Sequence, residues 1–209
     1  MKLISDSFAD NQRIPGEFAF CVPNPGSHAC LGNNRNPHLA WADVPPGARS
    51  LVLLCHDPDV PSVGDDVNKE GHIVPASLPR VDFFHWVLVD LAPEPMHIMA
   101  GEFSSAVTPR GKAGPAGPRG TRQGINDYTN WFAGDADMGG DYYGYDGPCP
   151  PWNDAIRHRY VFTLFALDVE RCPLDGRFTG QAVRGAIAGH VLAQTSLTGI
   201  YSLNPAVDP

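Results

Sequence analysis

Phe83–Leu91 reads FFHWVLVDL, a stretch of Val, Leu and aromatic residues that is apolar at nearly every position. Ser50–His56 (SLVLLCH) and Arg159–Leu167 (RYVFTLFAL) have the same character. Such runs predict β-strands, and the near absence of alternation predicts that both faces of the second and third strands are covered. No helical pattern of about ten to fifteen residues links the strands, which argues against a repeating strand–helix–strand fold. We therefore predict a mostly β protein, with these strands central in one sheet or in a sandwich of two sheets.

The C-terminal part contains one helical pattern. Apolar residues recur every four positions within Gly180–Gln194, and Thr179 precedes them as a candidate N-cap. Ser196–Leu203 (SLTGIYSL) then predicts a final strand. We expect the helix to cover one edge or one face of the sheet.

Length and composition narrow the classes of protein. The chain has 209 residues, which predicts a single domain over residues 1–209, with long loop insertions at about 62–80 and 101–146. Its formal net charge is −8 and its basic residues are scattered, so nucleic acid is not expected as a partner. The 22 glycines and 21 prolines predict many turns and exclude an all-helical bundle.

The lack of a targeting pattern and the spacing of the cysteines both favour a cytoplasmic location. No apolar run approaches the roughly 20 residues of a membrane span, and the N-terminus lacks a signal-peptide pattern. The cysteines are odd in number and show no CxxC spacing, which argues against a disulfide framework and a cysteine zinc site. We expect reduced thiols at all five positions, which are Cys21, Cys30, Cys55, Cys149 and Cys172.

Gly101–Cys149 is rich in glycine and has no sustained apolar period, so it predicts a long loop without extended regular structure. Loops of this length are usually functional or disordered. Within it, Gly111–Gly120 predicts a flexible, turn-rich stretch. The neighbouring aromatic residues indicate that the rest is ordered, because so much apolar area is rarely left in water. These residues are Tyr128, Trp131, Phe132, Tyr142, Tyr143 and Tyr145.

Polar groups accompany each of the three strands. DPDVP at Asp57–Pro61 follows the first strand, where two prolines should end strand pairing and aim the carboxylates from a fixed turn; the alternative is a solvated turn. His85 should share a face of its strand with Phe83, Val87 and Val89, and the alternative is a core histidine. His158 opens the third strand. Together these groups predict a pocket on a rigid scaffold.

Several segments, in this order along the chain, resemble the phosphatidylethanolamine-binding protein family, in its bacterial branch often called Raf-kinase-inhibitor-like proteins. The segments are DPDVP at 57–61, HW at 85–86, GINDY at 124–128, GPCPP with HRYVFTLFALD within 147–168, and GHVLAQTSLTGIYSL at 189–203. The resemblance implies a β-sandwich-like fold with a small pocket for phosphate-type anions, such as a phosphoethanolamine lipid head group or a phosphorylated residue. It implies a binding protein rather than an enzyme, without cofactor or metal. A kinase or protease partner and a homodimer are also implied.

Carried over residue by residue, the resemblance implies ligand-binding roles for Asp57, Asp59, His85, Gly147, Pro148, His158 and Tyr160. Asp82, shortly before the strand histidine, is a further candidate. An aspartate bonded to an imidazole favours its protonated form. We therefore expect His85 and His158 to donate to phosphate oxygens, helped by the Tyr160 hydroxyl and by backbone N–H groups of the Gly147 loop. Affinity for an anion should then fall as pH rises through the histidine pKa.

Three alternatives use the same residues differently. A metal-dependent hydrolase could draw its ligands from His56, Asp57, Asp59, His85 and His158, although no HxH or HExxH spacing supports it. Cys149 could be a reactive thiol rather than a small residue filling a proline-rich loop. A protein-interaction module could act through the long loops independently of the pocket, and His85→Ala would separate that function from one that uses the pocket.

Overall fold

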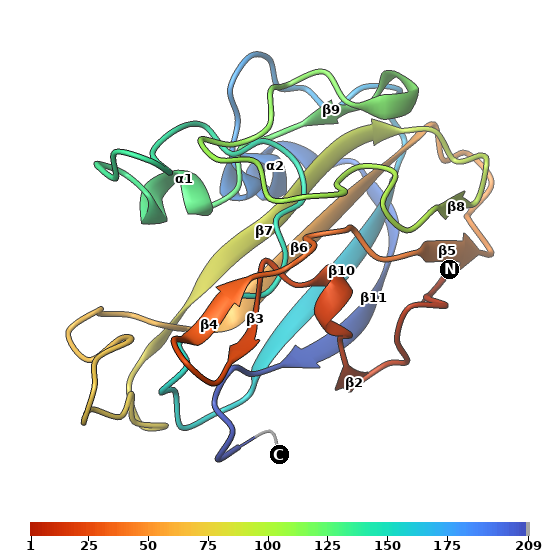
Figure 1. Cartoon of the computed structure of the whole chain (residues 1–209). Helices are drawn as coiled ribbons and strands as arrows, with labels where there is room; N and C mark the ends of the chain where they lie inside the picture. Colours follow the sequence, from red (N-terminus) through yellow and green to blue (C-terminus); the bar gives the residue numbers. More distant parts are fainter. Residues whose placement is uncertain (208–209) are drawn as a thin grey trace.

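The computed structural model describes residues 1–207 and is built on one central sheet. The sheet has six strands in the order β2-β11-β10-β6-β7-β9, and its four long strands pair antiparallel (Figure 1). The mostly β fold expected from the sequence is confirmed. The strands are β2 (Gln12–Arg13), β6 (Ser50–Pro61), β7 (Arg80–Leu91), β9 (Arg122–Gln123), β10 (His158–Leu167) and β11 (Val191–Tyr201).

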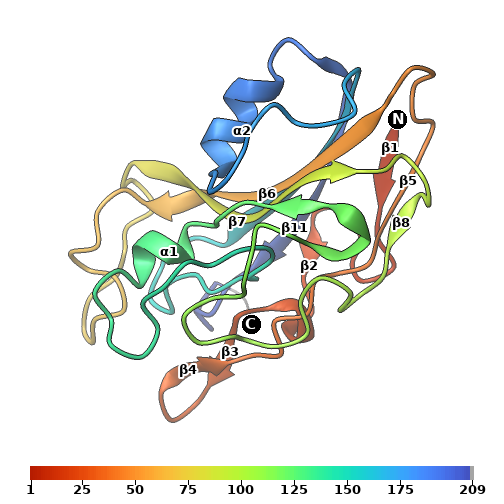
Figure 2. The ribbon, with the colours of Figure 1, turned by 90° about the horizontal axis from the view of Figure 1, so that it is seen from above.

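Two smaller sheets lie on one side of the central sheet, and the longest helix lies on the other (Figure 2). One small sheet joins β1 (Lys2–Ile4), β5 (Leu39–Ala42) and β8 (His97–Ile98), and the other is a hairpin of β3 (Cys21–Asn24) and β4 (His28–Leu31). The helices are η1 (Gly16–Phe18), η2 (Pro118–Gly120), α1 (Tyr128–Trp131) and α2 (Gly180–Ile187). None of the helices within residues 1–207 is both long and apolar enough to span a membrane.

The central sheet is covered on both faces, which explains why its strands are apolar at nearly every position. Leu51, Leu53 and Trp86 belong to the core on the side of the small sheets. Val52 and Leu54 belong to a second core that includes Val183 and Ile187 of α2 and lies on the opposite face. The helix therefore covers a face of the sheet, as expected, and the Thr179 side chain caps its N-terminus by accepting a hydrogen bond from the Ala182 amide.

The predicted helix at Gly180–Gln194 is too long. α2 ends at Ile187, and β11 begins at Val191, so the last strand also starts earlier than Ser196. Residues 191–194 pair with β10 as an extension of β11. Strand pairing outweighs the helical period here, because a local pattern of apolar residues carries no information about a distant partner strand.

DPDVP does not end the first strand. β6 continues to Pro61, and its pairing with β7 changes register between Asp57 (opposite Phe83) and Val60 (opposite Val81). Between these two pairs β6 advances by three residues and β7 by two, which defines a β-bulge on β6. The bulge accommodates a proline, which cannot donate a hydrogen bond to the neighbouring strand. The acids therefore project from a bulged strand rather than from a turn.

A second register shift changes the direction of His85. Cys55 lies opposite Trp86, but His56 lies opposite Phe84, so that His85 is the extra residue of a bulge in β7. His85 and Trp86 consequently lie on the same side of the sheet, whereas Val87 packs in the core under α2. His85 shares its face with Phe83, as expected, but not with Val87 or Val89, because the bulge resets the alternation.

The long loop contains no extended regular element, as expected, only η2, β9 and α1. Its aromatic residues are largely ordered in the core: Tyr128, Tyr142 and Tyr145 are buried. Residues 62–79 form turns and one isolated bridge, between Val74 and Asp154. Both long connections reach the end of the sheet where β6 and β7 carry their bulges, and there they help to enclose a pocket.

Candidate functional site

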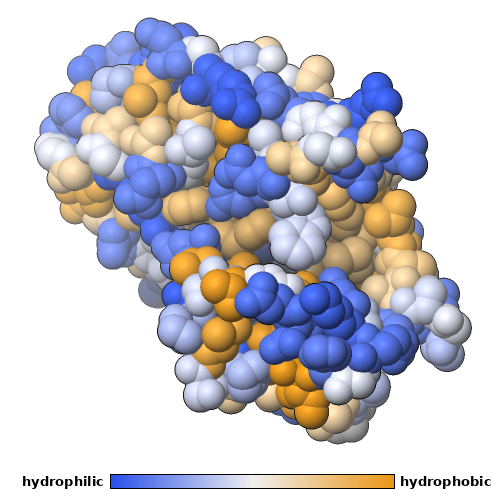
Figure 3. Space-filling view, turned by 90° about the vertical axis from the view of Figure 1, so that its left-hand side faces the viewer, coloured by the Kyte–Doolittle hydropathy of each residue, from blue (hydrophilic) through white to orange (hydrophobic). Residues whose placement is uncertain are grey.

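A pocket of about 330 Å³ lies where β6, β7 and β10 meet the β3–β4 hairpin and α1. Figure 3 faces this side of the molecule and shows a hollow between apolar side chains. The predicted residues that line it are Asp57, His85, His158 and Tyr160. Most of the remaining wall is apolar, and includes Phe20, Leu31, Val60, Phe83, Tyr128, Trp131, Phe132 and Met138. The pocket therefore combines a small polar floor with apolar walls.

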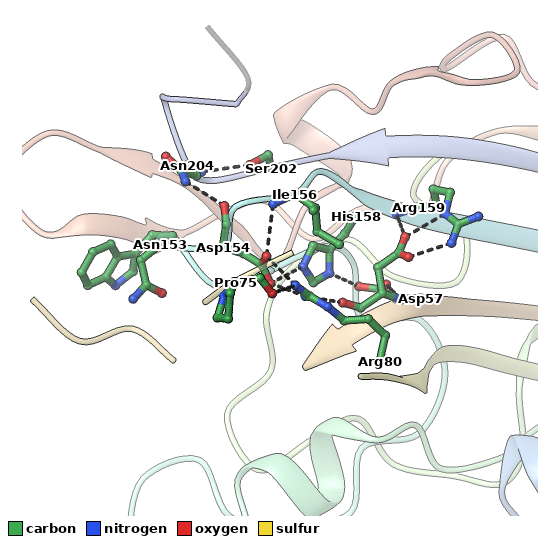
Figure 4. A network of polar contacts seen from close by, with 12 residues as sticks. Asp57, Pro75, Arg80, Asn153, Asp154, Ile156, His158, Arg159, Ser202 and Asn204 are labelled. Carbon is green, nitrogen blue, oxygen red and sulfur yellow. Dashed lines mark hydrogen bonds and ion pairs between the residues drawn. The ribbon is translucent and has the colours of Figure 1, made fainter. Parts of the chain in front are cut away.

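His158 is held between two carboxylates beneath the pocket (Figure 4). Its Nδ1 lies 2.7 Å from Asp57 Oδ2 and its Nε2 lies 3.1 Å from Asp154 Oδ2. Burial lowers the His158 pKa, but the two carboxylates outweigh burial and raise it to about 9. The ring is thus a cation, as expected, but both of its N–H groups are already used. His158 cannot be the phosphate donor that the sequence suggested; it neutralises the carboxylates instead.

The same network neutralises the other nearby acids. Arg80 donates to both oxygens of Asp154, at 2.5 and 3.0 Å, and Arg159 donates to both oxygens of Asp59, at 2.8 and 2.7 Å. Burial raises the Asp59 pKa, but the hydrogen bonds from Arg159 outweigh it and the pKa is lowered. Three carboxylates thus face three cations. Asp59 belongs to this network rather than to the pocket lining, and Arg80 and Asp154 were not predicted.

His85 has the opposite charge state. Its Nδ1 lies 2.8 Å from the backbone oxygen of Asp146, which can only accept, so Nδ1 carries the proton. Burial lowers the His85 pKa to about 4 and outweighs the nearby Asp57 carboxylate. At neutral pH His85 is therefore uncharged and Nε2 is an acceptor. His85 is therefore neutral rather than protonated as the sequence suggested.

The Tyr160 hydroxyl is an unpaired donor at the floor of the pocket. Tyr160 is 1% exposed, and its hydroxyl has no hydrogen-bond partner among residues 1–207. Its ring packs edge-on against His85, with 5.0 Å between the ring centres. Buried hydroxyls in proteins nearly always have a partner. The two rings therefore lie in contact at the floor, and the Tyr160 hydroxyl has no partner among the residues that the structure describes.

Gly147 and Pro148 support the wall without lining the pocket. A Cβ on Gly147 would lie 2.1 Å from the Phe18 carbonyl oxygen, so only glycine fits there. The Gly147 amide donates to Asn34 Oδ1, and the Pro148 carbonyl accepts from the Phe20 and Cys21 amides. These two predicted residues position the pocket wall, and the Gly147 amide is not free to bind an anion.

The cysteine prediction is wrong at two positions. Cys21 and Cys149 form a disulfide, whereas Cys30 is free and exposed and Cys55 and Cys172 are free and buried. The two half-cystines are 128 residues apart, so no local spacing signals the pair. Cys149 is therefore not a reactive thiol in this structure, and the bonded pair forms part of the pocket lining.

The remaining candidates lie elsewhere. His56 packs on Phe84 and near Arg184, on the α2 side of the sheet, and Asp82 forms an ion pair with Arg184 at 2.5 Å. Neither lines the pocket. The proposed metal ligands are thus divided between two faces, and residues 1–207 contain no group of three His, Cys, Asp or Glu side chains able to hold a metal ion.

The two long connections supply the part of the wall that the motifs did not reveal. Tyr128, Trp131 and Met138 come from the glycine-rich segment, and Val67 and Asn68 come from the connection between β6 and β7. The aromatic content of the first segment was a signal of order, but nothing in the sequence placed its residues beside the strand histidine. One side of this segment therefore faces the pocket.

The comparisons with known proteins agree with this architecture. A phosphatidylethanolamine-binding protein family profile matches residues 4–202. YbhB of Escherichia coli is 32% identical over 202 residues, which cover 97% of this chain and 100% of that protein. A relative from Aquifex aeolicus is 30% identical and covers 96% of this chain and 88% of its own length.

Solved structures show the same fold. A phosphatidylethanolamine-binding protein homologue from Chlamydia trachomatis has a TM-score of 0.63 at 27% identity, with 96% of both chains covered. YbcL of Escherichia coli has a TM-score of 0.67 at 22% identity, with 96% of this chain and 97% of that chain covered. The chain belongs to the phosphatidylethanolamine-binding protein family, in the bacterial group that contains YbhB and YbcL.

Proposed function

We propose that the protein binds a small phosphate-bearing ligand in this pocket and acts as a binding protein rather than as an enzyme. The observation that carries the proposal is the buried Tyr160 hydroxyl, which has no partner within residues 1–207 and lies beside the His85 ring. A phosphate oxygen would accept a hydrogen bond from the Tyr160 hydroxyl. The apolar wall would hold a small organic group attached to the phosphate, such as a phosphoethanolamine or phosphorylated side chain.

The charges around the floor favour a phosphate that carries one proton. Neutral His85 presents Nε2 as an acceptor, so a protonated phosphate oxygen can donate to it. Asp57 lines the same pocket, but its Oδ2 is bound by His158 and its Oδ1 by the Asp59 amide, so it offers the ligand no donor. The bound state then holds one proton between the phosphate and His85.

The pH dependence of binding tests this arrangement. The second pKa of a phosphate monoester is about 6, so above this pH the complex must take up a proton as it forms. We expect the affinity for phenyl phosphate, measured by isothermal titration calorimetry, to fall about 50-fold between pH 6 and pH 8. Phenyl sulfate has no proton to donate to Nε2 and should bind at least about tenfold more weakly at pH 6.

Two histidine variants give the matched control. His85→Ala should reduce phenyl phosphate affinity at least about tenfold at pH 6, because the acceptor is lost. His56→Ala removes a histidine from β6 on the other face of the sheet and should leave affinity unchanged. Constant affinity from pH 6 to pH 8 would refute the shared proton. Absence of binding at every pH would refute the proposed function.

A protein-interaction role is the second candidate, and one observation favours it. Leu31 and Trp131, at the pocket, are 56% and 54% exposed, which is unusual for large apolar side chains around one opening. A kinase or protease partner would contact this rim. Inhibition of such a partner that survives His85→Ala but is lost in Trp131→Ser would assign inhibition to the rim rather than to the pocket.

The remaining expectations form part of the same proposal: one domain over residues 1–209, a cytoplasmic location and a homodimer. Sedimentation velocity tests the dimer directly. The location is tested by measuring which cell fraction contains the protein and whether the Cys21–Cys149 pair is oxidised there, with free thiols blocked during lysis. Such disulfides are rare in a reducing cytosol. A fully reduced pair in the cytosolic fraction would fit the cytoplasmic prediction.

A further inference from the structure

The Cys21–Cys149 disulfide is built into the wall of the pocket. Cys21 begins β3, Cys149 lies in the Gly147–Pro151 segment, and both half-cystines line the pocket together with Pro150 and Pro151. The bond therefore joins two pieces of wall that are 128 residues apart in the sequence.

The segment around Cys149 is packed against its surroundings but has few amide donors of its own. Residues 147–151 read GPCPP, and its three prolines have no amide hydrogen to donate. The Gly147 amide donates to Asn34, and the Pro148 carbonyl accepts from the Phe20 and Cys21 amides at 2.9 and 3.0 Å. The Gly147 carbonyl accepts from the Tyr128 hydroxyl and the Pro151 carbonyl from the Asp154 amide. A proline-rich wall of this kind depends on the disulfide for its position more than a hydrogen-bonded strand would.

The bond is placed where a ligand would cover it. Cys21 is buried, with 9% exposure, whereas Cys149 is half-buried and faces the pocket. A thiol reagent that enters the empty pocket therefore reaches the Cys149 sulfur more readily than the Cys21 sulfur. An occupied pocket closes that route.

We propose that the Cys21–Cys149 disulfide is a redox switch for the pocket: its reduction releases the Gly147–Pro151 wall and lowers ligand affinity. The loss of ligand affinity rests on the proposed function, whereas the release of the wall on reduction does not. Because linkage is reciprocal, a ligand that binds the oxidised protein more tightly must by the same factor make the disulfide harder to reduce.

The chemistry is an ordinary thiol–disulfide exchange with a dithiol as reductant. One reductant thiolate attacks the Cys149 sulfur, the bond between the two cysteines breaks, and Cys21 leaves as a thiolate that takes up a proton. The second reductant thiol then attacks the mixed disulfide and releases Cys149. Two electrons pass to the protein, and the reductant ends as an internal disulfide.

Dithiothreitol and phenyl phosphate provide the test, in a Cys30→Ser background that removes the exposed thiol as an exchange partner. We expect reduction to lower phenyl phosphate affinity at least about tenfold, and saturating phenyl phosphate to raise the dithiothreitol concentration needed for half-reduction. The double variant Cys21→Ser with Cys149→Ser should have the affinity of the reduced protein. Circular dichroism reports whether each form remains folded.

Hydrogen exchange provides a readout that needs no ligand. Exchange of the Phe20 and Cys21 amides, which both donate to the Pro148 carbonyl, should speed up at least about tenfold on reduction. Unchanged exchange overturns the inference. Equal affinity in the oxidised and reduced proteins overturns it while the proposed function stands. Absence of binding to the oxidised protein refutes the proposed function, and the exchange rates still decide whether the wall is released.

Discussion

Replacement of Tyr160 by phenylalanine should change stability and binding in opposite directions. The Tyr160 hydroxyl is buried without a partner in residues 1–207, and such a group costs about 1 to 3 kcal/mol of folding free energy. Phenylalanine keeps the ring and its edge-on packing against His85. We therefore expect Tyr160→Phe to raise the free energy of unfolding by about 1 kcal/mol or more in the empty protein.

Ligand binding should respond the other way. A hydrogen bond to a charged acceptor contributes about 1.5 to 3 kcal/mol, so loss of the Tyr160 donor should weaken phenyl phosphate binding by about 10- to 150-fold. A gain in stability joined to a loss of affinity is expected of a group that is kept for binding rather than for folding.

Urea unfolding followed by fluorescence measures the first quantity, and isothermal titration calorimetry at pH 6 measures the second. Tyr145→Phe is the matched control, because the Tyr145 hydroxyl is equally buried but donates to the Phe18 carbonyl at 2.7 Å. That variant should lose about 1 to 2 kcal/mol of stability and keep its affinity within about threefold. If Tyr160→Phe proves less stable and binds phenyl phosphate normally, the hydroxyl is not a ligand donor.

Two further predictions concern stability. The His158 pKa of about 9 and the His85 pKa of about 4 lie on opposite sides of the unfolded value of about 6.5. The His158 contribution is complete below about pH 6.5 and is lost as pH rises to about 9, whereas the His85 contribution is lost as pH falls from about 6.5 to 4. Each histidine should therefore contribute about 3 kcal/mol to a stability maximum near neutral pH, measured by urea unfolding, and a monotonic profile would contradict this. Gly147→Ala should lower stability by about 2 kcal/mol or more, because its Cβ would meet the Phe18 carbonyl oxygen at 2.1 Å. Gly185→Ala, within α2 and in open space, should instead raise stability by about 0.5 to 1 kcal/mol; equal effects of the two substitutions would contradict the packing argument.

The central strands could be predicted because a strand that is covered on both faces is apolar at nearly every position. Phe83–Leu91 and Arg159–Leu167 are apolar at nearly every position because both faces of the sheet pack against a core, one under the small sheets and one under α2. The ends of elements were not predictable in this way. Residues 191–194 continue a helical period but pair with β10, and that pairing depends on a strand about thirty residues earlier.

The bulges explain the errors at the site. Asp57 and His85 each lie at a change of register between β6 and β7. A bulge is a property of two paired strands, so neither DPDVP nor FFHWVLVDL reveals it alone. The Cys21–Cys149 bond and the contacts of Asp154 are likewise long-range, and local spacing did not indicate them.

Four of the predicted site residues line one pocket, but the charge of each histidine follows from partners that only the fold supplies. His85 and His158 both contact the same pocket, yet one is neutral because burial dominates, and the other is a cation because two carboxylates hold it. A cation with no free donor cannot bind a phosphate directly, and a neutral imidazole can bind one only through a proton. We therefore predict that the pocket selects for the protonation state of a phosphate ligand, and that the phosphate rather than a histidine sets the pH range of binding.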